Sequence, residues 1–331
     1  MSTPPTITTV ASRKLAQKVL VSPVMRSFFY LFAAYVLMCL FLSWIAPNFF
    51  TARNFVNVFR QMSMIAIIGV GMTMVIVGAE IDLSVGSVAA FSGVLTALMA
   101  VQWKWPMPVA LTATLLVAAC SGAIIGLLRV TLRIPSFITS LGLLTALRSG
   151  AFLMSGGFPI SPLPPSFDFL GNGLVGPIPV PVILMVIIYA LGYVAMTQIP
   201  WGRELYAVGG NEEAARLSGI SVARIKISIF VITAALAGFA GIILASRLNS
   251  GTPAVAVGWE LDVIAAVIIG GTSLFGGSGG LPGTILGALF MATIQDGMVL
   301  MGLSPFSQGV VSGIVIVAAV VAGTLQTRSR R

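Results

Sequence analysis

Ten apolar runs constrain the fold of this chain more than any other feature, because most of them are long enough to cross a membrane. A spanning helix needs about 20 predominantly apolar residues to cross a hydrocarbon layer roughly 30 Å thick. Charged residues make up only 8% of the chain, against about 25% in soluble domains. The sequence therefore predicts an all-α polytopic membrane protein. The runs cover residues 28–46, 62–79, 83–101, 108–128, 134–154, 180–199, 227–245, 263–275, 281–300 and 306–323.

The eighth run, residues 263–275, is too short to cross. As a helix it would reach about 20 Å. We expect it either to extend into residues 258–262 or to enter the membrane and break at Gly270 and Gly271. The sequence leaves open whether the third and eighth runs span completely.

Basic residues indicate the orientation, since cytoplasmic loops carry an excess of lysine and arginine. If all ten runs cross and the N-terminus is inside, thirteen of the 18 basic residues lie inside and four outside. This topology places both termini and the loop at 200–226 in the cytoplasm. It also explains the net charge of +9 better than nucleic-acid binding does, because no basic run alternates with aromatic residues.

The chain divides into one transmembrane domain and two short tails. We expect a cytoplasmic N-terminal tail at 1–26, a transmembrane domain at 27–324 that includes the loop at 200–226, and a basic cytoplasmic tail at 325–331. The first run lacks a small-residue cleavage site, which favours a retained helix over a removed signal peptide. Outside, the proline- and glycine-rich residues 156–179 predict either an ordered cap or contact surface for a partner, or a plain connecting loop.

One long polar stretch interrupts the apolar sequence. Residues 201–226 hold seven charged residues between two spans. Within this stretch, Glu213, Ala214 and Ala215 favour a helix, and Gly219 is placed to end it. A short helix on a cytoplasmic loop predicts a docking surface for a separate protein that supplies energy.

Two acidic pairs occupy matching places in the order of the runs. Glu80 and Asp82 lie between the second and third runs, and Glu260 and Asp262 lie between the seventh and eighth. In the predicted topology the first pair is cytoplasmic and the second is outside, as an inverted repeat of runs two to five and seven to ten requires. Asp82 also precedes a predicted helix start, and for this residue we favour N-capping over contact with a solute.

The sequence lacks the residues that catalysis would require. The stretch at 270–283 is rich in glycine, but a Walker A loop needs a lysine and none follows Lys226. The chain has no histidine, and it shows neither a Ser–Lys arrangement nor paired intramembrane aspartates. We therefore expect a chain without enzymatic activity, metal site or cofactor. Cys39 and Cys120 each lie in an apolar run, where they are expected to act as small apolar side chains.

Polar residues at membrane depth are candidates for a translocation path, because placing them in lipid is costly. Asp296 lies within a run beside Gln295, and it is expected either to line a path or to lie near the outer end of that run. Arg148 is expected either to pair with Asp296 or to turn its head group toward the membrane surface. So few charges in the spans favour an uncharged, hydroxyl-rich solute over an ion. The candidate path residues are Asp82, Ser84, Glu260, Asp262, Gln295 and Asp296.

Several segments together resemble a known family. The residues Glu213, Ala214, Ala215 and Gly219 are similar to the first half of the EAA loop in membrane subunits of binding-protein-dependent ABC importers; the second half is not matched, because no Leu-Pro follows Ile229. The resemblance to ribose/xylose/arabinose-type permeases is carried by IDLSVGS at 81–87, PSFI at 135–138, GGNEEAARLSGI at 209–220, ELDVIAAVIIGGTSL at 260–274 and LMGLSP at 300–305. Departures at Ala79-Glu80 and Gln295-Asp296 leave the sugar unassigned.

The resemblance implies a permease subunit of an ATP-driven importer in a bacterial cytoplasmic (inner) membrane, carrying a pentose or hexose. It implies a separate ABC ATPase, which uses the ATP, a periplasmic or lipid-anchored sugar-binding protein, and a second permease subunit. We expect that subunit to be a second copy of this chain in a homodimer, and the sequence leaves a heterodimer with a paralogue open. Coupling would pass through the helix at 211–219. Its contact residues would be Glu212, Glu213, Ala214, Ala215, Arg216 and Gly219. The alternative is a stand-alone carrier or channel for a small neutral solute, with this loop an ordinary solvated segment.

Overall fold

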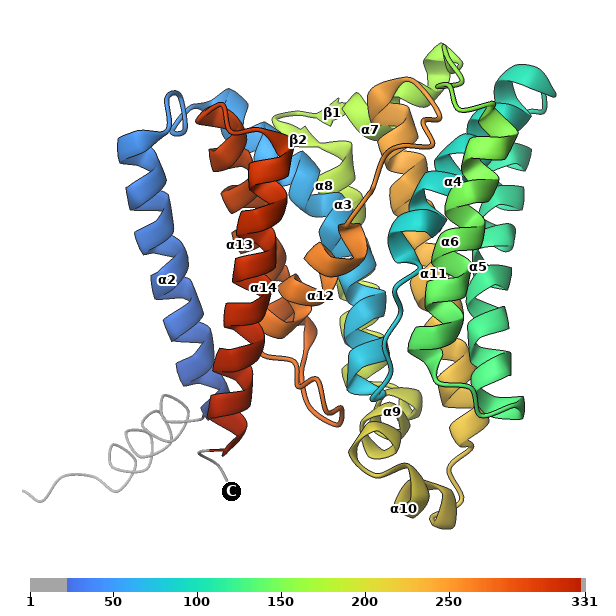
Figure 1. Ribbon diagram of the computed structural model, residues 1–331, viewed down its shortest axis with the longest axis vertical. Helices are drawn as coiled ribbons and strands as arrows, with labels where there is room; N and C mark the ends of the chain where they lie inside the picture. The colour runs from blue at the N-terminus through green and yellow to red at the C-terminus, as the bar shows by residue number, and fades with distance from the viewer. Residues whose placement is uncertain (1–22, 329–331) are drawn as a thin grey trace, which may run out of the picture.

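The protein is a bundle of helices that run side by side (Figure 1). The computed structural model describes residues 23–328. Within this range eight helices are long and apolar enough to cross a membrane, which confirms the predicted all-α polytopic class. They are α2 (Pro23–Ile45), α3 (Ala52–Val77), α4 (Val85–Ala97) with its π-helical continuation η1 (Leu98–Gln102), α5 (Met107–Thr131), α6 (Ser136–Ser155), α8 (Val180–Thr197), α11 (Val222–Leu248) and α13 (Leu281–Leu300).

Two further helices, α12 (Trp259–Ile269) and α14 (Pro305–Arg328), account for the eighth and tenth predicted runs. Since α2 begins at Pro23 and α14 ends at Arg328, the predicted tail boundaries at 26 and 325 fall inside helices. The remainder of those tails, 1–22 and 329–331, lies outside the described residues.

Two short helices, α9 (Pro200–Gly210) and α10 (Glu212–Leu217), lie at one end of the bundle. The first residues of α2 and the last of α14 lie at that same end (Figure 1). This arrangement agrees with the predicted topology, in which both termini and the loop at 200–226 are cytoplasmic. We therefore call it the cytoplasmic end.

Two helices begin part-way through the bundle. Residues 78–84 form a non-helical segment between α3 and α4, and residues 249–258 form another between α11 and α12. Figure 1 shows the first segment rising from the cytoplasmic end and the second descending from the opposite end. Helix α12 has 11 residues, a length of about 16 Å. The eighth run therefore does not span: it starts earlier than its apolar residues, at Trp259, and ends before Gly270.

The same order of elements occurs twice. Helix α3 is followed by a non-helical segment, the short α4, and then α5 and α6; α11 is followed in the same way by α12, α13 and α14. Figure 1 shows α3 and α11 crossing the bundle in opposite directions. This order and direction match the inverted repeat expected from the two acidic pairs.

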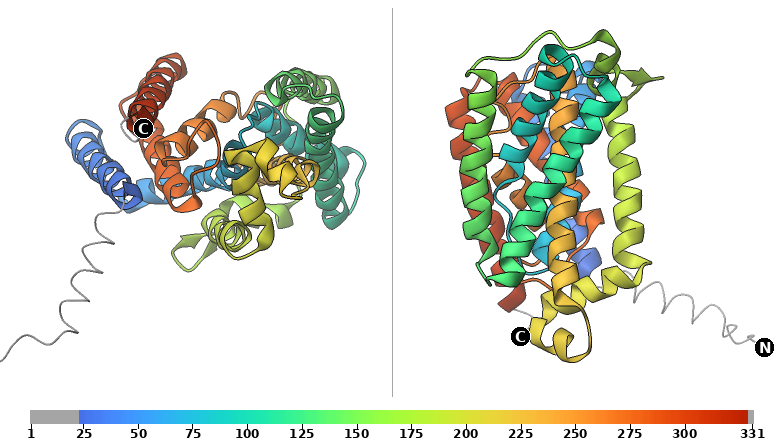
Figure 2. Two further views of the ribbon diagram at one scale, coloured as in Figure 1. Left: turned by 90° about the horizontal axis from the view of Figure 1, so that it is seen from below. Right: turned by 90° about the vertical axis from the view of Figure 1, so that its right-hand side faces the viewer.

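Helix α11 lies at the centre, packed against α3, α4 and α5, while α2 stands at one edge against α13 (Figure 2). Glycine permits close approach of the backbones at these contacts. At Gly122 on α5, an added Cβ would overlap the carbonyl oxygen of Phe230 on α11, and Phe230 is fully buried. The backbones of α5 and α11 therefore touch directly at this point.

Replacing Gly122 by valine is expected to destabilise the bundle by about 1–3 kcal/mol, because overpacking against a backbone cannot be relieved by a side-chain rotation. Gly142→Val on α6 is the matched control, since an added Cβ there meets nothing within 4 Å. Thermal unfolding of both variants in one detergent gives the comparison. Equal midpoints would contradict the close approach of α5 and α11.

The outer segment between α6 and α8 is ordered. It contains η2 (Pro165–Phe167), α7 (Asp168–Asn172) and an antiparallel hairpin of β1 (Leu174–Val175) and β2 (Ile178–Pro179). The backbones of Ile160 and Gly251 exchange hydrogen bonds, and the N–H of Gly171 donates to the hydroxyl of Ser246 at 2.8 Å. Residues 156–179 therefore form an ordered cap rather than a plain connecting loop. The contact of this cap with a partner stays a prediction.

Candidate functional site

The polar loop folds into α9 and α10 because its local signals agree. The Asn211 side chain caps α10 by accepting a hydrogen bond from the N–H of Ala214 at 3.0 Å. Gly219 follows the helix with φ of +83°, a conformation that glycine adopts without steric penalty. The helix predicted within 211–219 is present as Glu212–Leu217, and Figure 2 shows it protruding beyond the bundle.

Helix α10 presents charge to solvent and buries one small residue. The side chains of Glu213 and Arg216 are 69% and 51% exposed, whereas Ala215 is buried. The N–H of Ile220 donates to the carbonyl of Ala215 at 3.1 Å and turns the chain back toward α11. The result is a short, fixed and exposed surface, as a docking site requires.

Two acids and two bases, Glu80, Arg129, Glu212 and Lys226, join α10 to the membrane helices; we call them the bridging cluster. Lys226 Nζ lies 2.6 Å from Glu80 Oε1 and 3.7 Å from Glu212 Oε2. Arg129 Nε lies 2.7 Å from Glu80 Oε1, and its Nη2 lies 3.3 Å from Glu212 Oε2. Each base therefore contacts both acids.

The inner half of the bridging cluster is deeply buried. The side chains of Lys226 and Glu80 are 3% and 5% exposed, and Lys226 Nζ also donates to the carbonyl of Gly78 at 2.8 Å. Charged groups are stable at such burial only when they are paired and hydrogen-bonded. This pair therefore fixes the end of α3 against the start of α11.

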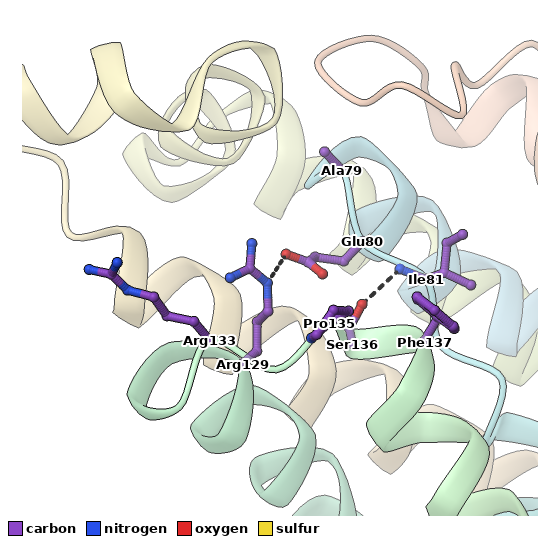
Figure 3. A pocket seen from close by; sticks show the side chains of 8 residues that line it. All are labelled: Ala79, Glu80, Ile81, Arg129, Arg133, Pro135, Ser136 and Phe137. Atoms are coloured by element: carbon purple, nitrogen blue, oxygen red, sulfur yellow. Dashed lines mark hydrogen bonds and ion pairs between the residues drawn. The ribbon is translucent and has the colours of Figure 1, made fainter.

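Two cavities flank the bridging cluster. One cavity of about 330 Å³ lies beside segment 78–84. Among the residues that line this cavity, Arg129 points toward Glu80 and Arg133 points away from it (Figure 3). The other, of about 510 Å³, is lined by Arg129, Glu212 and Lys226. The cytoplasmic ends of α5 and α6 thus leave room next to the segment that leads into α4.

Of the candidate path residues, Asp82 and Ser84 lie together at the start of α4. Asp82 Oδ1 accepts hydrogen bonds from the N–H of Ser84 at 2.8 Å and from its hydroxyl at 2.6 Å. The N-cap of α4 is Ser84, two residues after Asp82. The expectation that Asp82 caps this helix is therefore wrong. The reason is that Asp82 forms a local turn in front of the helix. Asp82 is fully buried.

Glu260 and Asp262 lie in the first turn of α12. At Gly86 in the first turn of α4, an added Cβ would overlap Glu260 Oε2, so the starts of the two short helices meet inside the bundle. Gln295 on α13 donates to Asp262 Oδ2 at 2.8 Å and accepts from Gln61 on α3 at 3.1 Å. The fold therefore brings Asp262 and Gln295 together.

Asp296 points away from these residues, toward the start of α3. Its Oδ2 accepts a hydrogen bond from Asn54 at 2.8 Å, near the outer end of α13. Arg148 does not pair with Asp296, so that expectation is wrong, and its orientation toward the membrane surface stays a prediction. Its guanidinium donates to the carbonyls of Pro253, at 3.0 Å, and Ala256, at 3.2 Å, because the non-helical segment before α12 leaves these carbonyls without helical partners.

Sequence reasoning noted Glu80 as half of an acidic pair but missed the bridging cluster. Arg129 and Lys226 each lie where an apolar run meets a cytoplasmic loop. A charge at such a position is ordinarily taken as a mark of orientation. Only the folded chain brings these two bases into contact with Glu80 and Glu212.

Residues 54–320 match the family model described as a branched-chain amino acid transport system permease component. The chain belongs to this family. No solved structure matches it. With eight candidate spans in its described part, this permease is a multi-pass protein of the bacterial cytoplasmic membrane, the membrane subunit of an ABC importer.

Similar proteins cover nearly the whole permease. The ribose import permease protein RbsC of Haemophilus influenzae is 40% identical over 295 residues, covering 88% of this chain and 91% of that protein. The protein of the same name from Bacillus subtilis is 40% identical over 291 residues, with coverage of 87% and 90%. The xylose transport system permease protein XylH of Escherichia coli is 34% identical, with coverage of 88% and 90%.

Proposed function

We propose that this permease forms the translocation path for a monosaccharide, a pentose or hexose, in an ATP-driven importer. The proposal rests mainly on α10, a capped and exposed helix at the cytoplasmic end. Ion pairs connect this helix to the membrane helices. The names of the similar ribose and xylose permeases support the solute class. The scarcity of charge, 8% of the chain, fits a neutral solute.

Three partners complete the proposed importer: an ATPase at α10, an extracytoplasmic sugar-binding protein at the cap of residues 156–179, and a second permease copy. The ATPase binds and hydrolyses ATP, so this chain itself needs no cofactor and has no catalytic residue. The permease residues that receive the ATPase movement are Glu212, Glu213, Ala214, Ala215, Arg216 and Gly219.

The proposed path passes between the starts of α4 and α12. The carboxylate oxygens Asp82 Oδ2 and Glu260 Oε2 lack hydrogen-bond partners within residues 23–328, and sugar hydroxyls are donors that suit them. Because Gly86 packs against Glu260, the path is closed here. Transport then requires the two helix starts to separate, with segments 78–84 and 249–258 moving in turn.

Uptake by proteoliposomes tests the proposal. The permease is reconstituted with its ATPase and binding protein, and uptake of labelled ribose and xylose is followed with and without ATP. The proposal expects uptake only when all three proteins and ATP are present. Uptake by the permease alone, without ATP, would show a stand-alone carrier or channel instead.

A further inference from the structure

The members of the bridging cluster come from four different elements. Glu212 begins α10, Lys226 lies near the start of α11, Arg129 lies in the last turn of α5, and Glu80 lies in the segment before α4. Each base contacts one acid on α10 and one in segment 78–84. Movement of α10 away from the bundle therefore either carries Glu80 with it or separates a charged pair.

The bridging cluster becomes more buried from α10 inward. The side chain of Glu212 is 33% exposed, that of Arg129 25%, and that of Glu80 5%. Charge attraction grows stronger as water is excluded. Within the bridging cluster, the ion pairs to Glu80 in segment 78–84 are thus the stronger ones, and the ion pairs to Glu212 on α10 are the weaker ones.

The N–H groups of the first three residues of segment 78–84 donate to carbonyls at the end of α3. Beyond them, the other hydrogen-bonded N–H groups of the segment donate to side chains. Lys226 binds the carbonyl of Gly78, and the N–H of Ile81 donates to Ser136 Oγ at 3.3 Å. Asp82, two residues beyond Glu80, is bonded to Ser84 at the start of α4. A cavity of about 330 Å³ lies beside the segment (Figure 3). The segment is therefore held by the bridging cluster through Glu80 and has space into which it can move.

We infer that Arg129 and Lys226 are positioning residues for transport, which carry movement of α10 to segment 78–84 and so to the start of α4. The inference rests on the proposed function, because it takes α10 as the surface that the ATPase moves. Neither base needs to touch the solute or the ATPase for this role. Their removal should therefore affect coupling rather than docking.

Arg129 is the better of the two to test, because its loss leaves Glu80 paired with buried Lys226. In Arg129→Gln, the ATPase still co-purifies and still hydrolyses ATP, but solute imported per ATP falls at least about fivefold, the low end of typical coupling between sites. Arg129→Lys keeps the charge on a single ammonium group, which cannot reach both acids with separate nitrogens, and gives an intermediate value. Arg133→Gln is the control, since Arg133 is exposed and points away from Glu80.

Solute imported per ATP at the wild-type value in Arg129→Gln would overturn the inference. Loss of the ATPase from the purified complex would also overturn it, because the residue would then act in docking. If Arg129→Gln does not reach the membrane, Arg129→Lys carries the test: a lowered ratio supports the inference and a wild-type ratio overturns it. A wild-type complex whose uptake needs no ATP would overturn the proposed function itself, and this result is read from the wild type alone.

Discussion

Replacing Gly219 by proline is expected to abolish ATP-driven uptake while leaving the permease in the membrane. Gly219 has φ of +83°, whereas the proline ring holds φ at about −65°. Proline also lacks the N–H that donates to the carbonyl of Arg216 at 3.0 Å. The end of α10 must therefore change direction, and the docking surface changes shape with it.

The effect should stay local, because an added Cβ at Gly219 meets nothing within 4 Å. Gly219→Ala is the matched control: it strains the left-handed backbone by about 1–2 kcal/mol but keeps the N–H, and it is expected to retain much of the uptake. Uptake and the amount of protein in the membrane are measured for both variants. Normal ATP-driven uptake by Gly219→Pro would contradict the coupling role of α10.

Replacing Lys226 by methionine is expected to lower the free energy of unfolding by about 3–5 kcal/mol, because it leaves a buried acid without part of its compensating charge. Lys226 is only 3% exposed and contacts Glu80 at 2.6 Å. Adding Glu80→Gln to the same chain should recover part of the loss, since the charge that lost its partner is then gone as well. Denaturant or thermal unfolding in detergent measures all three proteins.

Arg224→Met serves as the control for this series, because Arg224 is exposed on the same helix two residues away. Its effect should stay within about 0.5 kcal/mol. A Lys226→Met protein that unfolds like the wild type would show that the buried ion pair contributes nothing to the fold. A double variant less stable than Lys226→Met would show that Glu80 is not the group left unpaired.

Features that depend on short stretches of sequence were predictable. The long apolar runs correspond to the helices of the bundle, and α10 follows from residues that are near neighbours in the chain, with Ala214 and Ala215 before Gly219. The matching positions of the acidic pairs also indicated the inverted order of helices. For the spans and α10, the signal and the structure lie within a few residues of each other.

Features that depend on contacts between distant residues were not predictable. Arg148 looked like a charge in need of an acid, yet its partners are backbone carbonyls that only a broken helix leaves free. Arg129 and Lys226 were interpreted as signals of membrane orientation, and for that reason their contact with Glu80 was not predicted. Asp82 lies in front of α4 as expected, but the helix starts later than expected, because Asp82 and Ser84 form a local turn before it.

The central claim, that α10 docks an ATPase, is tested most directly by affinity purification of the tagged permease from membranes in mild detergent. Wild type is compared with Glu213→Arg, which reverses a charge whose side chain is 69% exposed on α10, and with Asp168→Arg, the same reversal at an exposed residue of the outer cap. We expect mass spectrometry to find an ATPase with wild type and Asp168→Arg and to find it lost with Glu213→Arg. Equal recovery from all three proteins, or no ATPase with the wild type, would contradict the claim.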